Sequence, residues 1–130
     1  MIKPRILIVD DETDIRQSFA DFLFKRLDCS VDAISNGAEA IQALDREGYH
    51  VLLLDLHMPG VDGFTVLAHA KQKAPGIIAL VVTRLDDPAK TKAVEDLGAI
   101  YVSKPVTLKA LLLILERELE KKGGFQYKKK

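Results

Sequence analysis

The sequence is poor in features that mark several classes of protein. Its single cysteine, Cys29, excludes an intrachain disulfide and a cysteine-rich zinc site. Basic and acidic residues number 19 each, so no net charge draws the chain to nucleic acid or to an anionic membrane. No apolar run approaches the ~20 residues of a membrane helix, and the apolar start at Ile6 is too short for a signal peptide. We therefore expect a cytoplasmic protein that binds neither membrane nor nucleic acid directly.

Motifs for nucleotide and DNA binding are also missing. The sequence contains no GxGxxG and no P-loop pattern, and no helix-turn-helix or basic reading helix fits within it. Its 130 residues, 48% hydrophobic and 29% charged, suit one globular domain with a core of its own. Either the protein acts alone by binding partners, or this chain is one part of a longer protein.

Short apolar runs alternate with amphipathic segments about five times. The runs that we expect to be strands are residues 5–9, 29–34, 51–54, 77–82 and 100–102. The segments between and after them show helical spacing, with Pro88 and Thr107 suited to helix starts and Lys122 near the last helix end. This alternation predicts an α/β fold, a single doubly wound five-stranded parallel sheet with five helices.

The end of the chain differs in composition from the rest. Its last ten residues include five lysines, and Gly123 and Gly124 terminate the last predicted helix. We expect the domain to span residues 1–122. Residues 123–130 are expected to be a short basic tail or the start of a linker, solvated rather than packed.

Polar side chains follow the predicted strands. Asp10 and Asp11 end the first strand, Asp55 the third and Thr83 the fourth, and Lys104 follows the fifth. In open parallel sheets, ligands bind beyond the carboxyl ends of the strands. Three carboxylates gathered there repel one another unless a cation neutralises them. Mg²⁺ suits this edge because it needs few carboxylates and keeps water and phosphate oxygens as ligands.

A carboxylate beside Mg²⁺ can attack phosphorus and form an aspartyl phosphate. Phosphoryl transfer mainly requires positioning and charge neutralisation. Lys104 can supply a point charge to one phosphate oxygen, and Thr83 a hydroxyl hydrogen bond to another. The simpler alternative is that Asp10 and Asp11 only cap the following helix and that Thr83 and Lys104 are ordinary turn and surface residues.

Four segments resemble the signature of the receiver domains of bacterial two-component response regulators. They are Val9-Asp10-Asp11-Glu12, residues 54–63 (LDLHMPGVDG), Val82-Thr83 and Ser103-Lys104-Pro105. The resemblance covers roughly residues 4 to 122, in order. It implies a flavodoxin-like receiver fold and a phosphoacceptor that switches conformation. It also implies a cognate histidine kinase or phosphotransfer protein as partner.

The resemblance assigns roles to individual residues. Asp55 matches the phosphorylated aspartate, and Asp11 and Asp55 match direct Mg²⁺ ligands. Asp10 matches a ligand that acts through water, and the backbone carbonyl of His57 matches the remaining protein ligand. Lys104 matches the family's lysine, which a cis peptide joins to the next residue.

The resemblance also implies a conformational switch, and the leucine run of the last helix raises the question of an interface. Thr83 and Tyr101 match a pair in which the threonine moves to the phosphate and the aromatic ring turns inward. The apolar run Leu111–Leu115 exceeds one core-facing stripe. One interpretation is that phosphorylation promotes a homodimer or partner binding through the fourth helix, fifth strand and fifth helix. The alternative is that these leucines cover neighbouring helix ends in a monomer.

Some positions depart from the family pattern. Arg84 stands where a small residue is usual, so a receiver-like interaction module that no longer takes phosphate stays open. His57 and Leu85 occupy the positions that flank the route of the attacking water. A haloacid-dehalogenase-like phosphatase is a further alternative. It requires a second aspartate two residues after the nucleophile, whereas Glu12 stands two residues after Asp10.

Overall fold

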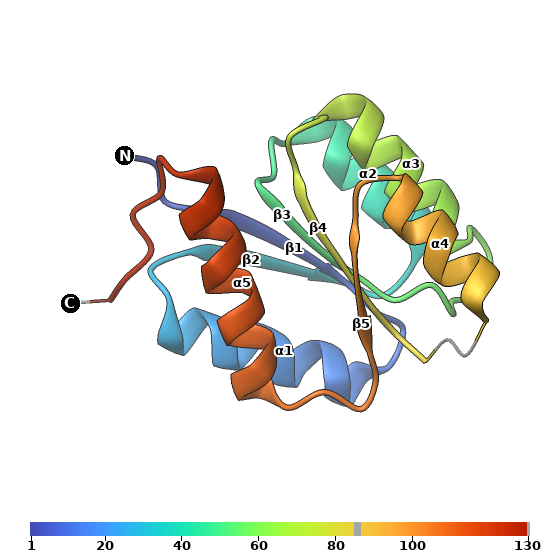
Figure 1. The fold of residues 1–130 in the computed structure, drawn as a ribbon, viewed down its shortest axis with the longest axis horizontal. Coiled ribbons are helices and arrows are strands. Elements are labelled where there is room, and N and C mark those ends of the chain that lie inside the picture. The colour runs from blue at the N-terminus through green and yellow to red at the C-terminus, as the bar shows by residue number, and fades with distance from the viewer. Residues whose placement is uncertain (85–86, 130) are drawn as a thin grey trace.

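The computed structural model describes residues 1–84 and 87–129. Ten elements alternate along the chain: β1 (Arg5–Val9), α1 (Thr13–Arg26), β2 (Ser30–Ile34), α2 (Gly37–Arg46), β3 (Val51–Leu54), α3 (Gly63–Lys73), β4 (Ile78–Thr83), α4 (Pro88–Asp96), β5 (Ile100–Ser103) and α5 (Leu108–Lys122). The strands form one parallel sheet in the order β2-β1-β3-β4-β5. Helices α1 and α5 cover one face and α2, α3 and α4 the other (Figure 1). The predicted doubly wound α/β fold is confirmed.

Alternation along the strands divides the interior into two cores. On β1, Ile6 and Ile8 face α1 and α5, whereas Leu7 and Val9 face the opposite helices. Side chains on a strand point to opposite faces in turn, so a strand covered on both sides is apolar throughout. The unbroken apolar runs of β1, β3 and β4 therefore place these strands in the centre of the sheet.

The helices α4 and α5 begin where Pro88 and Thr107 predict. Thr107 Oγ1 accepts a hydrogen bond from the backbone N–H of Ala110 at 3.0 Å and caps α5. Asp87 caps α4 in the same way through the N–H of Ala89, with Pro88 in the first turn. These caps fix where α4 and α5 begin.

The run Leu111–Leu115 is less exposed than its composition suggests. Leu111, Leu112 and Leu115 are buried in the core between α5 and the sheet, and Ile114 packs partly against it. Leu113 is 56% exposed. Of the apolar side chains in this run, only Leu113 is therefore left largely exposed.

The chain beyond α5 packs against the domain, so the expectation of a solvated terminus is wrong for this segment. Phe125 and Tyr127 are 8% and 6% exposed and belong to the core under α1 and α5. The Phe125 ring meets the His50 ring edge to face, with centroids 5.2 Å apart. Tyr127 Oη donates a hydrogen bond of 2.5 Å to Glu120 at the end of α5. Burial of these two rings holds the segment on the domain.

The same segment is hydrogen-bonded to the start of the chain. The N–H of Ile2 donates to Gly124 O, and the N–H of Gln126 donates to Ile2 O, each at 2.9 Å. The N–H of Asp28 donates to Tyr127 O at 2.7 Å. Ile2 and Asp28 precede β1 and β2, so the segment crosses the amino ends of these strands.

None of the helices in residues 1–84 and 87–129 combines the length and the apolar character needed to cross a bilayer.

Candidate functional site

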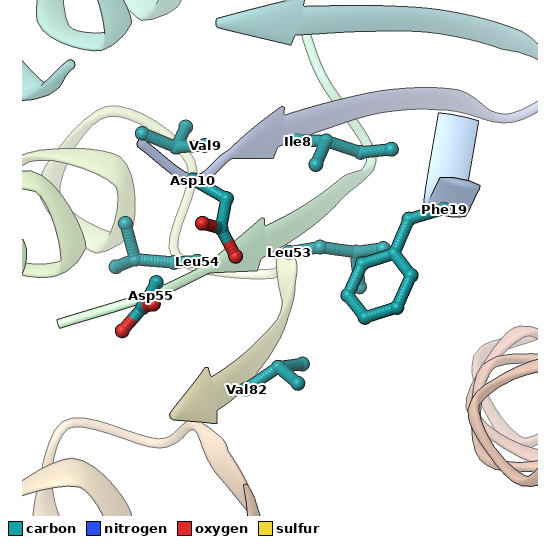
Figure 2. Close-up of a pocket in the computed structure, with 8 residues that line it drawn as sticks. All are labelled: Ile8, Val9, Asp10, Phe19, Leu53, Leu54, Asp55 and Val82. Carbon is teal, nitrogen blue, oxygen red and sulfur yellow. The ribbon is translucent and has the colours of Figure 1, made fainter. Parts of the chain in front are cut away.

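Two buried carboxylates lie side by side at the carboxyl edge of the sheet. Asp10 follows β1 and Asp55 follows β3, and β1 and β3 are paired neighbours with Val9 opposite Leu54. Asp10 is 3% exposed and Asp55 4%. Figure 2 shows both carboxylates at the ends of these two strands, next to apolar side chains of the sheet and of α1. The sheet therefore brings together two charges that are 45 residues apart in the sequence.

Lys104 joins these two carboxylates. Its Nζ lies 2.9 Å from Asp10 Oδ2 and 2.8 Å from Asp55 Oδ2, and the lysine side chain is almost fully buried. Burial lowers the pKa of Lys104, but the hydrogen bonds to Asp55 and Asp10 outweigh it and leave the pKa above its usual value. The lysine is therefore charged and balances part of the negative charge of the site.

Asp11 adds a third carboxylate, from the exposed side. One oxygen from each of Asp10, Asp11 and Asp55 lies within 4.8 Å of the others. Burial raises the pKa of Asp10, against the opposing effects of Lys104 and of the Glu12 N–H, which donates to Asp10 Oδ1 at 2.9 Å. Oxygen-only donors with partial exposure suit a hard divalent cation. The arrangement is compatible with a metal site.

The other Asp55 oxygen accepts two hydrogen bonds. Thr83 Oγ1 donates to Asp55 Oδ1 at 2.8 Å, and the backbone N–H of His57 donates to the same oxygen at 2.9 Å. Thr83 is fully buried and is the last residue of β4, one residue beyond the predicted strand, because it pairs with Ser103 of β5. Asp55 is thus held by three donors, with Lys104 on Oδ2.

The Asp55 loop requires glycine at one position. A Cβ on Gly63, the first residue of α3, would lie 2.6 Å from Leu56 Cα and 2.9 Å from Asp55 O. Such contacts force the backbone apart, so only glycine lets α3 begin this close to Asp55. Steric contact therefore explains why the 54–63 motif ends in glycine.

The side chains of His57 and Arg84 lie at the surface above the site. His57 is exposed, and its Nε2 lies 3.0 Å from the backbone oxygen of Arg84. The Arg84 side chain is exposed and lines a hollow of about 200 Å³ together with Lys104 and Pro105. Leu85, expected to flank the site, lies outside the described residues.

The last two sequence expectations concern β5 and the turn after it. Tyr101 is half-buried on β5 and packs against the core on the α4 side. Its inward movement with Thr83 stays a prediction. The Lys104–Pro105 peptide is cis, as the resemblance implies.

One supporting contact was not foreseen from the sequence. Arg16, on the first turn of α1, donates from its guanidinium to the backbone oxygen of Asp10 at 2.9 Å. This bond fixes the turn that carries Asp10 and Asp11. In the sequence, only the position of Arg16 in the first predicted turn of the helix could indicate this contact. Many surface arginines occupy such positions without binding a backbone oxygen.

Comparisons with known proteins agree with this geometry. The family model described as "Response regulator receiver domain" matches residues 6–116. Transcriptional regulatory protein ResD of Bacillus subtilis is 29% identical over 95% of this chain and 51% of its own length. DNA-binding transcriptional regulator NtrC of Escherichia coli is 31% identical over 88% of this chain and 24% of its own length. The chain therefore spans about half or less of these relatives.

Solved structures show the same fold. A CheY-like response regulator receiver domain protein from Methanospirillum hungatei has a TM-score of 0.86 and 29% identity, and the match covers 94% of this chain and all of that one. The beryllofluoride-activated DrrB receiver domain has a TM-score of 0.83 and 27% identity, with 92% and 99% covered. Receiver domains are in general not enzymes, which removes support for a dehalogenase-like phosphatase. The chain belongs to the receiver domain family of two-component response regulators.

Proposed function

We propose that this chain takes a phosphoryl group on Asp55 from a phosphohistidine of a cognate histidine kinase or phosphotransfer protein. A carboxylate oxygen of Asp55 bonds to phosphorus as the P–N bond to the imidazole breaks, and the bonding electron pair returns to the imidazole nitrogen. We expect the transfer to take place in the cytoplasm. The observation that supports this role is the convergence of Asp10, Asp11, Asp55, Thr83 and Lys104 at one edge of the sheet.

The proposed metal is Mg²⁺, held by Asp11 and Asp55 directly, by Asp10 through water and by the backbone carbonyl of His57. When bound, it would neutralise charge that develops on the phosphoryl oxygens. The donor set fits, since carboxylate oxygens of three aspartates gather within 4.8 Å and one of them, Asp11, is exposed.

Two further side chains, Lys104 and Thr83, would contact the transferred phosphoryl group. Lys104 already lies 2.8 Å from Asp55 Oδ2, so its ammonium can follow the negative charge from the carboxylate to a phosphoryl oxygen. Thr83 donates to Asp55 Oδ1, and its hydroxyl can turn to a phosphoryl oxygen instead. Lys104 neutralises charge on the phosphoryl group and Thr83 positions it by a hydrogen bond, while Asp55 alone forms a covalent bond. The chain therefore assists its own phosphorylation without being an enzyme for another substrate.

Intact mass measurement tests the assignment. Wild-type protein, Asp55→Asn and the control Asp96→Asn would be treated with acetyl phosphate, with and without Mg²⁺. Asp96 is an exposed acid of α4 paired with Lys92, remote in sequence from the cluster. We expect a phosphate-sized mass gain in the wild type and the control, only with Mg²⁺, and none in Asp55→Asn. A gain in Asp55→Asn would place the chemistry elsewhere, and no gain in any protein would favour the interaction module that takes no phosphate.

We also propose that phosphorylation promotes a homodimer through α4, β5 and α5. Leu113 supports this surface because it is the exposed leucine of α5. Light scattering during size-exclusion chromatography, with and without Mg²⁺ and beryllofluoride, would measure the mass of wild type and Leu113→Gln. We expect a dimer in the wild type with beryllofluoride and a weaker one in the variant. A monomer in all samples at high concentration would leave binding to a separate partner.

A further inference from the structure

The His57 side chain connects two loops that leave the sheet on either side of Asp55. Its Nε2 lies 3.0 Å from the backbone oxygen of Arg84, directly after β4. A carbonyl oxygen can only accept, so the proton of the ring lies on Nε2 and His57 is the donor. The hydrogen bond therefore ties the loop after β3 to the backbone of Arg84.

Both ends of this link are also tied to the proposed phosphoacceptor. The backbone N–H of His57 donates to Asp55 Oδ1 at 2.9 Å, and Thr83, the neighbour of Arg84, donates to the same oxygen at 2.8 Å. Asp55, His57 and the Thr83–Arg84 pair thus form a closed ring of hydrogen bonds. A phosphoryl group on Asp55 would offer Thr83 a new acceptor. The bond from the His57 ring to Arg84 does not involve the carboxylate, so it would oppose a movement of Arg84 with Thr83.

Packing leaves room for such a shift. His57 lines a hollow of about 300 Å³ with Lys90 of α4, and Arg84 lines the hollow of about 200 Å³ beside Lys104. The hydrogen bond therefore joins two residues that each line a surface hollow. Since few packed side chains surround Arg84 there, this hydrogen bond contributes a large share of what holds Arg84 in place.

We propose that the His57 side chain is a positioning residue that holds the backbone of Arg84, next to Thr83, in its unphosphorylated arrangement. The His57 bond thereby lowers the fraction of the protein in the arrangement that binds a phosphoryl group. The apparent affinity for a phosphoryl mimic such as beryllofluoride falls in proportion to that fraction. This inference rests on the proposed function of Asp55. It differs from simple shielding of the aspartyl phosphate from water, which would change only the rate of phosphate loss.

Three substitutions separate the hydrogen bond from the bulk of the ring. His57→Gln keeps a side-chain N–H donor of similar reach, His57→Leu keeps bulk without a donor, and His57→Ala removes both. The side chain is exposed, so all three are expected to fold. Each leaves the backbone carbonyl at residue 57 in place for the metal.

The measurements are beryllofluoride affinity with Mg²⁺, by calorimetry, and the backbone carbonyl ¹³C chemical shift of Arg84 in the free protein, which reports the hydrogen bond that this oxygen accepts. We expect His57→Leu and His57→Ala to bind beryllofluoride about two- to tenfold more tightly than wild type, the range of one net hydrogen bond. The Arg84 carbonyl shift should move away from the wild-type value in both variants. His57→Gln should stay near wild type in both measurements.

The outcomes distinguish this proposal from failure of the phosphoacceptor assignment. Wild-type protein that binds no beryllofluoride would remove both together. Normal wild-type binding with unchanged affinity in His57→Leu and His57→Ala would overturn the role of His57 alone. A change only in the rate of phosphate loss, after phosphorylation with acetyl phosphate, would also overturn it and assign His57 to shielding from water.

Discussion

The Thr83 hydroxyl donates to Asp55 Oδ1 across 2.8 Å, inside the buried carboxyl end of the sheet. We expect Thr83→Val to lower the free energy of unfolding by about 2 kcal/mol, since a hydrogen bond to a charged carboxylate is lost while the shape is kept. The same variant should lose most of the change in amide chemical shifts of β4 and β5 on addition of Mg²⁺ and beryllofluoride. Thr83→Ser keeps the hydroxyl and should retain that change. Equal shift changes in both variants would contradict the role of the hydroxyl.

The second prediction concerns the carboxylate cluster. Asp11→Asn should lower Mg²⁺ affinity by about tenfold or more, because even groups that only support a metal ligand contribute that much. Without metal, the variant should be as stable as wild type or more stable, since it relieves repulsion with Asp10 and Asp55. Calorimetric titration and thermal unfolding without Mg²⁺ measure the two effects. Asp14→Asn, an acid in the first turn of α1, is the matched control, and equal Mg²⁺ affinity in both variants would contradict the site.

Truncation of a ring beyond α5 tests whether that segment belongs to the domain. Phe125→Ala should lower the free energy of unfolding by about 3 kcal/mol, the lower end for loss of a buried phenylalanine, because the ring lies at the margin of the core. Gln126→Ala, at an exposed position between the two rings, should change it by less than about 0.5 kcal/mol. Urea unfolding measures both values. Similar stability of the two variants would mean that the segment is detached in solution.

Acid should destabilise the fold through His50. Its Nδ1 accepts the N–H of Arg5 at 3.0 Å, so the folded state needs a neutral ring. Burial lowers the pKa of His50, and the nearby charges of Lys122 and Arg5 lower it further. The unfolded chain binds a proton near pH 6.5 and the folded chain only at lower pH, so this stability is complete above about pH 6.5 and is lost as the pH falls below it.

His50→Asn keeps an acceptor that does not titrate and serves as the control for this pH dependence. The free energy of unfolding, measured between pH 7 and pH 5, should fall more steeply in the wild type than in His50→Asn. Parallel curves for the two proteins would show that other groups cause the loss of stability in acid.

Much of the fold and of the site follows from local sequence pattern. The apolar runs of β1, β3 and β4 are unbroken because both faces of these strands are covered, and parallel strands share one carboxyl edge. Residues at strand ends therefore meet, whatever their separation along the chain. This rule alone predicts that Asp10, Asp55 and Lys104 lie close together.

The contacts that were missed depend on distant partners or on side-chain rotamers. Phe125 and Tyr127 stand among lysines, and only their alternation with Gln126 indicates a buried extended segment, while the surface that receives them comes from the other end of the chain. Arg16 and the His57 ring bind backbone oxygens that any residue could provide. Composition and periodicity do not encode such pairings.

The hydrogen bonds of Ile2 with Gly124 and Gln126 place the start of the chain beside the segment that follows α5. A flexible linker could therefore join this segment to Ile2, and new ends could be opened at Gly48, which is exposed and where an added Cβ would meet nothing within 4 Å. Such a circular permutant would start with β3 and keep every strand pairing. Its new termini would lie at the amino edge of the sheet, so an attached reporter would leave the edge with Asp55 open to a phosphodonor.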